Sequence, residues 1–407
     1  MIALFWRMLA ALSFLGTATS SVFLLLVLIA TARFKLRARK QLRIALRVPA
    51  EDLPPVTIFK PVHGMEERLE ENLASFFRQD YPRYEIIIGS RSADDPAIRI
   101  AQRLRDRYPH VPSRIVISGP PEWPNAKVFT LDKMIPLSNY DFFISSDSDV
   151  RVGGDFLRHI VPPLLEEKLG LVTCLYRGEP VAGDFWSMLE ALGMSVEMPS
   201  GVVVADMLEG IRFALGPALA VRRDAVEAIG GIAVTADYYS DDYVLGHKIW
   251  AAGYKVIFSH YSVAHVLTAR PFLRTLGDQL RWMKSTRHSR PWGHIGAGLT
   301  FAVPFGLVGL LAGLWSGHFR LGLALLLIAF LNRVVQSIAV GWGLLRDRRA
   351  LWLSWLYPLR DLQGFAIWVA SFVSHRFHWR GEIYRFSEGG KILPQDRENR
   401  TAAEVRA

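Results

Sequence analysis

Disulfide bonds can play no part inside this chain, because its 407 residues include a single cysteine. One cysteine cannot form an internal disulfide, which excludes a small scaffold held together by such bonds. Cys174 lies in the apolar run LVTCLY, where we expect a buried thiol rather than a reactive one. Charged residues are also scarce, at 21% of the chain, while 51% of the residues are hydrophobic. This balance excludes a disordered chain.

Two phosphate-binding signatures are missing as well. No GxGxxG, GxxxxGKS or GxxxxGKT follows a predicted strand, so the sequence supports neither a dinucleotide-binding fold nor a P-loop. Acidic residues are fewer than basic ones, 38 against 48, which leaves a formal net charge of +10. Such an excess suits nucleic acid, an anionic membrane surface or a phosphorylated substrate.

An uncharged stretch between Arg7 and Arg33 favours the membrane among these partners. It is long enough to cross ~30 Å of hydrocarbon and too long for the core of a cleaved signal peptide. Residues 33–47 follow with seven basic residues and no acidic one. The positive-inside rule then places the N-terminus outside and the following residues in the cytoplasm. We expect lipid headgroups, and no nucleic acid, to be the partners of this basic segment.

Three further apolar stretches occupy the C-terminal third, at residues 295–317, 321–345 and 355–374. The first two predict membrane-spanning helices, and the basic RDRR at 346–349 fits a cytoplasmic turn after them. The third either crosses the membrane or is re-entrant or interfacial. Arg333 lies within the second stretch, where it is expected either to line a lipid or substrate path or to snorkel to the interface.

The region from about residue 48 to 290 reads as a cytoplasmic α/β domain. Short apolar runs alternate with helical patterns, which predicts a parallel sheet with right-handed crossovers. The predicted strands lie at 56–60, 84–90, 114–118, 141–149 and 169–176. Ligands bind beyond the carboxyl ends of the strands in such sheets, so polar residues at those ends are candidate site residues.

Asp147 and Asp149 close the fourth predicted strand. At this spacing, both side chains project from the same face. Two hard oxygen ligands on one side suit Mg²⁺ or Mn²⁺, whereas the alternative is a solvated turn. Asp94 and Asp95 follow the second strand, where they serve a ligand site, the N-cap of a helix, or both. Lys127 could pair with a diphosphate or lie on the surface.

Asp241 and Asp242 stand at the start of a predicted helix. Acids there interact favourably with the helix dipole. Two like charges side by side also raise one pKa, which suits a general base. His265 follows a further apparent strand and is either a metal or phosphate ligand or a structural histidine.

Residues 271–287 predict an amphipathic helix lying on the membrane surface. Its two stripes are apolar, with Phe272, Leu276, Leu280 and Met283, and polar, with Arg274, Asp278, Arg281 and Ser285. This helix would place a catalytic cleft close to the bilayer.

Several pieces of the sequence, in this order within residues 54–290, resemble the ceramide glucosyltransferase family. They are FKPVHGMEERLEENLASFFRQDYP, ADDPAI, NAK, DSD, SDDYVLG and QLRWMKSTR. A sister branch that modifies hopanoid lipids shares nearly the same motifs. The resemblance implies a family-2-like membrane glycosyltransferase with the GT-A fold, a Rossmann-like and mostly parallel sheet. Its family Gln/Arg-x-x-Arg-Trp motif falls on residues 278–282, but Asp278 takes the first position and Gln279 comes one place late.

The resemblance also implies an inverting transfer of a sugar, with glucose expected, from a UDP-sugar to a lipid hydroxyl such as that of ceramide. Transfer of N-acetylglucosamine to a hopanoid, a processive polysaccharide synthase and an inactive membrane scaffold are the alternatives. Implied roles are a general base (Asp242), nucleotide-sugar binding (Asp94, Asp95, Lys127, Asp147, Asp149), diphosphate or acceptor binding (Asp241, Gln279, Arg281, Trp282) and Mg²⁺ or Mn²⁺ binding (Asp147, Asp149, His265).

The expected organisation is that of a multi-pass membrane protein. Its segments are an N-terminal transmembrane helix (1–33), a basic juxtamembrane segment (34–53), the GT-A catalytic domain (54–268), an amphipathic interfacial helix (269–290), two to three C-terminal membrane segments (291–377) and a polar tail (378–407).

Overall fold

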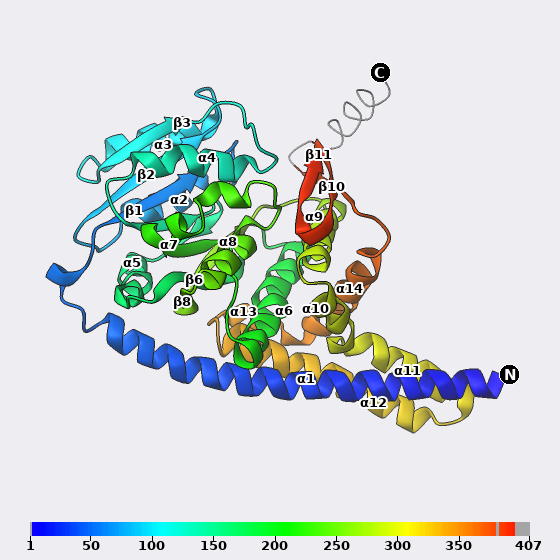
Figure 1. Cartoon of the computed structure of the whole chain (residues 1–407). Helices are drawn as coiled ribbons and strands as arrows, with labels where there is room; N and C mark the ends of the chain where they lie inside the picture. Colours follow the sequence, from blue (N-terminus) through cyan, green and yellow to red (C-terminus); the bar gives the residue numbers. More distant parts are fainter. Residues whose placement is uncertain (1, 380–381, 395–407) are drawn as a thin grey trace, which may run out of the picture. The chain divides into compact units, whose positions relative to one another are not determined.

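The structure, a computed structural model, describes residues 2–379 and 382–394 (Figure 1). Much of the predicted polar tail, from residue 395 onward, lies outside the described residues. The chain forms two compact units. The helical unit comprises Met1–Phe34, Ala182–Leu208 and Ala269–Gly390, and the sheet unit comprises Lys35–Val181, Glu209–Thr268 and Lys391–Ala407.

The sheet unit is built on an eight-stranded sheet with the order β3-β2-β1-β4-β7-β6-β8-β5. Its strands are β1 Val56–Pro61, β2 Tyr84–Ser90, β3 Ser113–Ile117, β4 Phe142–Ser146, β5 Val150–Arg151, β6 Leu169–Pro180, β7 Ala218–Arg222 and β8 Lys255–Leu267. The first four long strands run parallel, and β7 lies antiparallel between β4 and β6. The predicted mostly parallel α/β sheet is therefore confirmed.

The helices of the sheet unit follow its strands, as expected of crossover connections. They are α2 Leu69–Phe77, α3 Pro96–Arg107, α4 Ala126–Met134, α5 Phe156–Ile160, α7 Arg223–Ala228 and α8 Asp241–Ala251. A final short strand, β11, spans Ile392–Pro394. The carboxyl ends of β1, β2 and β4 point the same way, so the loops that follow them meet at one edge of the sheet.

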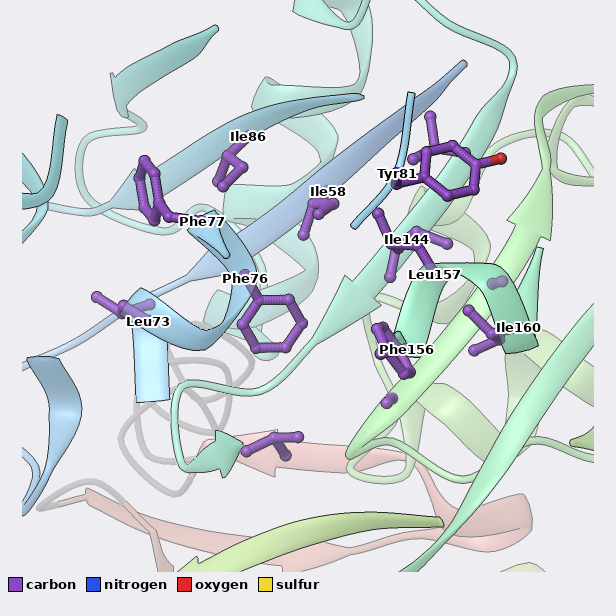
Figure 2. Packing of buried hydrophobic residues seen from close by; sticks show 14 of the residues in the cluster. Ile58, Leu73, Phe76, Phe77, Tyr81, Ile86, Ile144, Phe156, Leu157 and Ile160 are labelled. Carbon is purple, nitrogen blue, oxygen red and sulfur yellow. The ribbon is translucent and has the colours of Figure 1, made fainter. Parts of the chain in front are cut away.

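Apolar strand residues fix this arrangement by packing under helices. Ile58, Ile86 and Ile144 from β1, β2 and β4 are fully buried against Phe76 of α2 and Phe156 of α5 (Figure 2). The two phenylalanine rings meet edge to face at 6.0 Å. Burying such side chains stabilises the fold by ~1.5–3 kcal/mol each. The strand ends that carry the polar residues are therefore held in place by this apolar core.

The helical unit consists of long apolar helices and a β-hairpin. Its helices are α6 Phe185–Glu209, α9 Phe272–Ser289, α10 Pro291–Ala297, α11 Val303–Ser316, α12 Phe319–Gln336, α13 Arg348–Trp352 and α14 Tyr357–Ala370. The hairpin pairs β9 Arg376–Trp379 with β10 Glu382–Phe386. Helix α1, Ile2–Ala45, begins in this unit and continues through the basic segment into the sheet unit (Figure 1).

Three helices of the described chain are long and apolar enough to cross a membrane: Leu4–Ala45, Phe185–Glu209 and Phe319–Trp342. A fourth candidate is the pair Pro291–Thr300 and Val303–Ser316, which is bent by 47°. The first, the third and the bent pair lie where the sequence predicts spans. Helix α6 is an unexpected candidate, because it lies within residues 54–268, which are expected to form the catalytic domain.

Arg333 on α12 holds the bend between α10 and α11. It is 2% exposed, its Nε lies 3.3 Å from Asp361 Oδ1, and it donates to the carbonyl of Thr300. The other oxygen of Asp361 accepts from the backbone N–H groups of Ala302 and Val303, at 3.0 and 2.8 Å. One ion pair thus satisfies the free backbone groups on both sides of the break. The expectation that Arg333 snorkels to the interface is therefore wrong, because its side chain is buried in an ion pair.

Candidate active site

Asp147 and Asp149 lie directly beyond the end of β4. The turn between them is closed by a hydrogen bond from the N–H of Val150 to the carbonyl of Asp147, at 3.3 Å. The N–H of Asp147 itself donates to the carbonyl of Pro217, at 3.2 Å, which ties this turn to the loop before β7. The turn is therefore held by neighbouring strands, whereas a solvated turn would be free to move.

Lys127 faces this turn from the first turn of α4. Asn125 caps that helix, accepting from the N–H groups of Lys127 and Val128. The Nζ of Lys127 lies 2.7 Å from Asp147 Oδ1 and 3.6 Å from Asp241 Oδ2, and 15% of its side chain is exposed. The alternative of a surface lysine is therefore wrong. Burial lowers the pKa of Lys127, but the surrounding carboxylates outweigh this effect and raise it. The same ion pair holds the pKa of Asp147 down despite its burial.

Asp241 and Asp242 are the first two residues of α8, and Asp241 also contacts Lys127. Asn125 Nδ2 donates to Asp241 Oδ1 at 3.2 Å, so one asparagine orients both the lysine and an aspartate. Burial, together with repulsion from Asp241, raises the pKa of Asp242 to about 7. A Cβ atom at Gly216 would lie 3.1 Å from Asp242 Oδ2, so this glycine leaves the carboxyl room.

Lys60, the penultimate residue of β1, is completely buried beneath the Asp-Ser-Asp turn. Its Nζ donates to Ser146 Oγ at 3.2 Å and to the carbonyl of Asp147, and it lies 4.0 Å from the ring centre of Phe76. Burial lowers the pKa of Lys60 to about 7. Lys60 is not among the site residues predicted from the sequence, although a lysine near the end of an apolar strand is a signal that could have found it.

His265 and Glu66 approach Asp149. His265 Nε2 lies 3.4 Å from Asp149 Oδ2, while Asp149 Oδ1 and His265 Nδ1 are buried without a hydrogen-bond partner among the described residues. Burial and the charge of Asp149 raise the pKa of Glu66 to about 7, and burial also raises that of Asp149. These unpaired carboxylate and imidazole atoms are of the kinds that bind divalent ions. However, within residues 2–379 and 382–394 no three His, Cys, Asp or Glu side chains are gathered to hold one.

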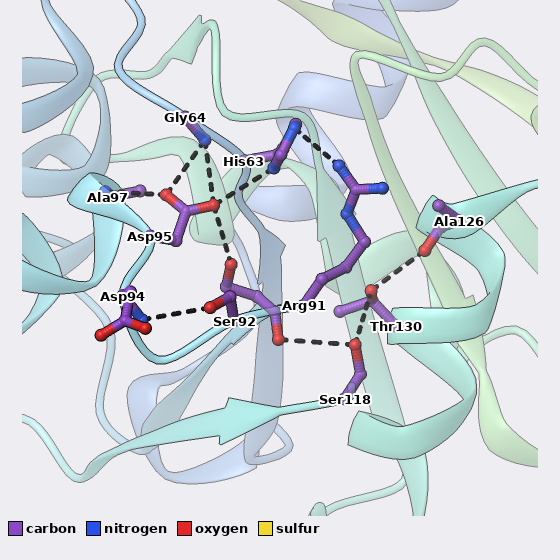
Figure 3. A network of polar contacts seen from close by, with 11 residues as sticks. His63, Gly64, Arg91, Ser92, Asp94, Asp95, Ala97, Ser118, Ala126 and Thr130 are labelled. Atoms are coloured by element: carbon purple, nitrogen blue, oxygen red, sulfur yellow. Dashed lines mark hydrogen bonds and ion pairs between the residues drawn. The ribbon is translucent and has the colours of Figure 1, made fainter. Parts of the chain in front are cut away.

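Asp94 and Asp95 differ sharply in their surroundings (Figure 3). Asp95 is the N-cap of α3, accepting from Ala97 N at 2.9 Å, and its carboxylate also accepts from Gly64 N and Ser90 Oγ. It lies 3.2 Å from His63 Nδ1, and these hydrogen bonds lower its pKa against the effect of burial. The predicted N-cap is confirmed, so Asp95 positions this loop. Asp94 is exposed beside it.

The three predicted diphosphate or acceptor residues of α9 belong to the helical unit. Arg281 pairs with Asp278 at 3.0 Å, and Trp282 is 39% exposed. Gln279 is 5% exposed and accepts from Arg360 on α14 at 2.6 Å. The helix is buried on a polar side, through Thr275, Gln279, Lys284 and Ser285, whereas its predicted apolar stripe is only half-buried.

The structure therefore gathers Lys127, Asp147, Asp241 and Asp242 into one polar cluster at the strand ends, with Asp149 and His265 beside it. Asn125, Gly216, Lys60 and Glu66 complete it without having been singled out by the sequence. The quoted NAK contains Asn125, but Gly216 carries no local signal, because its role depends on a residue 26 positions away.

Similarity to known proteins agrees with this cluster of acids and a lysine at the strand ends. The model of glycosyl transferase family 21 matches residues 21–392. The chain belongs to this family. It is therefore a glycosyltransferase, and the predicted resemblance is confirmed.

Two relatives of known function illustrate the breadth of the similarity. Ceramide glucosyltransferase 3 of Caenorhabditis elegans is 23% identical over 353 residues, which cover 84% of this chain and 75% of that protein. Beta-monoglucosyldiacylglycerol synthase of Trichormus variabilis is 25% identical over 184 residues, which cover 44% of this chain and 38% of that protein. These relatives do not favour the hopanoid, polysaccharide-synthase or inactive-scaffold alternatives.

The fold is similar to that of a mannosyltransferase from Pyrobaculum calidifontis, solved with GDP-Man and Mn²⁺. The match has a TM-score of 0.51 at 17% identity and covers 89% of this chain and 99% of that one. The expected GT-A fold is confirmed by this similarity.

Proposed function

We propose that this chain transfers glucose from a UDP-sugar to the hydroxyl of ceramide, with inversion at the anomeric carbon. The observation that carries the proposal is the half-buried carboxyl of Asp242, which lies beside a cluster able to receive a nucleotide diphosphate and whose pKa is raised to about 7. A base with such a pKa is half ionised near neutral pH, where it can accept the proton of an attacking hydroxyl.

The donor would lie across the strand ends. Asp94 and the loop positioned by Asp95 would hold the uridine. Lys127 stays protonated because its pKa is raised. When a donor is bound, its diphosphate would compete with Asp147 for Lys127 and pair with it. Asp147 and Asp149, with His265 beside them, would hold Mg²⁺ or Mn²⁺, which when bound neutralises charge on the leaving diphosphate.

The acceptor would reach this cluster from the membrane. Asp242 would take the proton from the lipid hydroxyl as the oxygen attacks, and Asp241 would keep the pKa of Asp242 high. Arg281 and Trp282 would contact diphosphate and acceptor. The basic residues 33–47 support a cytoplasmic position for the catalytic unit, where UDP-sugars would be the donors.

Replacement of Asp242 tests this function. Asp242→Asn keeps the size of the side chain but cannot accept a proton, so transfer to ceramide should fall by ~10²–10⁴-fold. UDP-sugar binding, measured separately by calorimetry, should be kept. Asp106→Asn, at an exposed position of α3, is the matched control and should behave as the wild type. Near-normal turnover of Asp242→Asn would remove this residue from the mechanism.

Diacylglycerol is a second candidate acceptor, favoured by the similarity to the diacylglycerol-modifying synthase. Purified protein should be assayed with radiolabelled UDP-sugars against ceramide, diacylglycerol and a hopanoid. Preferential labelling of ceramide by UDP-glucose is the expected outcome. Chelation should stop the reaction, and Mg²⁺ or Mn²⁺ should restore it.

A further inference from the structure

Helix α6 is apolar enough to cross a membrane, yet its connections prevent it from doing so. It follows β6 and precedes β7 along the chain. These two strands pair with each other in one sheet, with Leu171 opposite Val221. A single crossing by α6 would place paired strands on opposite sides of the bilayer. Helix α6 therefore does not make a single crossing from one side of the membrane to the other.

A charged residue stands near the middle of this helix. Glu197 Oε2 accepts from Arg360 Nη2 of α14 at 2.8 Å, and Arg360 Nη1 donates to Gln279 Oε1 of α9 at 2.6 Å. Arg360 is 7% exposed. Ionisable groups among apolar helices are costly and mark functional sites more often than surface charges do. Three helices of the helical unit thus contribute to one buried polar cluster.

The chain leaves room for this cluster at two glycines. A Cβ atom at Gly193 would lie 2.1 Å from Arg360 Nε, and one at Gly364 would lie 3.2 Å from Glu197 Oε1. Any larger residue at Gly193 would exclude Arg360 from its present position. The absence of side chains at these two glycines therefore makes space for the ion pair.

This pair differs from the Arg333–Asp361 pair of the same unit in what remains unsatisfied. Both side chains of the Arg333–Asp361 pair are 3% exposed, and each oxygen of Asp361 is engaged by protein groups. Glu197 instead keeps 31% of its side chain exposed. Gln279 Nε2 is buried without a partner among the described residues. One partly exposed acceptor and one buried, unsatisfied donor thus remain.

We propose that Glu197, Arg360 and Gln279 bind the polar headgroup of the lipid acceptor. This inference rests on the proposed lipid glycosyltransferase function. The ion pair is neutral overall and its accessible member is a carboxylate, so an anionic phosphate headgroup would be repelled. A carboxylate requires a donor, such as a hydroxyl or amide N–H, and the amide of Gln279 requires an acceptor, such as a carbonyl. A ceramide headgroup, with hydroxyls and an amide, offers both.

Glu197→Gln tests the site, because it keeps the volume and removes the charge that would hold a hydroxyl. In nanodiscs of phosphatidylcholine, we expect binding of ceramide without any UDP-sugar to weaken by at least about 10-fold, the value of one charge-assisted hydrogen bond. The KM for the lipid should rise similarly. The KM for the UDP-sugar and hydrolysis of the UDP-sugar by water should be unchanged. Glu197→Asp should recover part of the lipid affinity.

Asp347→Asn is the matched control for a purely structural effect. Asp347 is 3% exposed, pairs with Arg349 at 2.8 Å and accepts from Ser195 Oγ of the same helix α6. Its replacement should lower the Tm without changing the lipid KM of the folded protein. A Glu197→Gln protein with a lower Tm and an unchanged lipid affinity would overturn the proposal.

Two further outcomes separate this proposal from the proposed function. If wild-type protein binds ceramide through Glu197 but transfers no sugar to it, the proposed function fails and the site remains. If phosphatidylglycerol in the nanodisc competes with ceramide as well as unlabelled ceramide does, the site is not selective for a neutral headgroup and the proposal fails.

Discussion

Asp242 lies in surroundings that make its charged form unfavourable, since burial and the neighbouring Asp241 raise its pKa to about 7. A general base must be deprotonated to work. We therefore predict that kcat/KM for the UDP-sugar falls about tenfold for each pH unit below about 7, as expected for a single essential base. Initial rates between pH 5.5 and 9 at saturating lipid provide the measurement. A rate that stays constant down to pH 5.5 would contradict this assignment.

The same shift predicts an effect on stability. The pKa of Asp242 is raised above its ordinary value of 3.8, so the folded state binds this proton more tightly than the unfolded state does. Its favourable contribution is present below pH 3.8 and is lost as the pH rises through about 7. At pH 8 the ionised carboxyl of Asp242 destabilises the folded state, and Asp242→Asn removes this effect. The replacement should raise the Tm at pH 8 by about 2–4 °C, with a smaller rise at pH 5. Thermal unfolding in detergent checks both values, and an equal change at both pH values would be evidence against the shift.

Lys60 illustrates a residue whose importance only the structure reveals. Lys60→Met keeps the length of the side chain but removes the hydrogen bonds to Ser146 and to the carbonyl of Asp147. Because the Asp-Ser-Asp turn would lose its support, we predict a KM for the UDP-sugar at least about 10-fold higher. The Tm should change little, since removing a buried charge offsets the lost bonds. Lys133→Met, at a half-exposed position of α4, is the control, and an unchanged KM in Lys60→Met would refute the role.

At the scale of single elements, helix α9 presents two arginines in different settings. Arg281 pairs with Asp278 and donates to the carbonyl of His378, whereas Arg274 is exposed. If the planar guanidinium of Arg281 grips a diphosphate, a lysine cannot imitate it. We predict that Arg281→Lys lowers kcat/KM for the UDP-sugar at least ~10-fold and that Arg274→Lys has little effect. Liposome binding should survive both changes. Equal small effects would mean that the helix serves only as a membrane anchor.

Elements differ in how well their sequence predicts them. The strands β1, β2 and β4 are mostly apolar runs with polar residues near or beyond their ends, so their position follows from local pattern. Strand β7 is the short segment ALAVR, and only its pairing with β4 and β6 makes it a strand. Helix α6 was not expected as an apolar helix, because Glu190 and Glu197 interrupt its pattern. The pairing of Arg333 with Asp361 joins residues 28 positions apart and has no local signal.

At the scale of the whole molecule, the number of crossings determines on which side of the membrane the segments after the catalytic unit lie. Helix α6 cannot cross, because β6 and β7 are paired. Helix α14 has 14 residues, fewer than the ~20 needed to span the hydrocarbon, and it contains the buried Arg360 and Asp361. Helix α1, the bent pair α10–α11 and α12 then remain as three candidate crossings. If the basic segment after α1 lies inside, we expect the start of α12 outside and the basic RDRR and the residues after α14 inside, in agreement with the positive-inside rule.

Cysteine labelling can test this arrangement without a cysteine-free background. The native Cys174 is fully buried, and burial raises the pKa of its thiol to about 12, so it should not react. Arg105→Cys and Arg320→Cys place one thiol at an exposed position of α3 and one at the start of α12. A membrane-impermeant maleimide should label the first only in inside-out vesicles and the second only in right-side-out vesicles. Labelling of both from the same side would mean that the bent pair α10–α11 is re-entrant, and labelling of Arg105→Cys only in right-side-out vesicles would place the catalytic unit outside, away from the proposed donor.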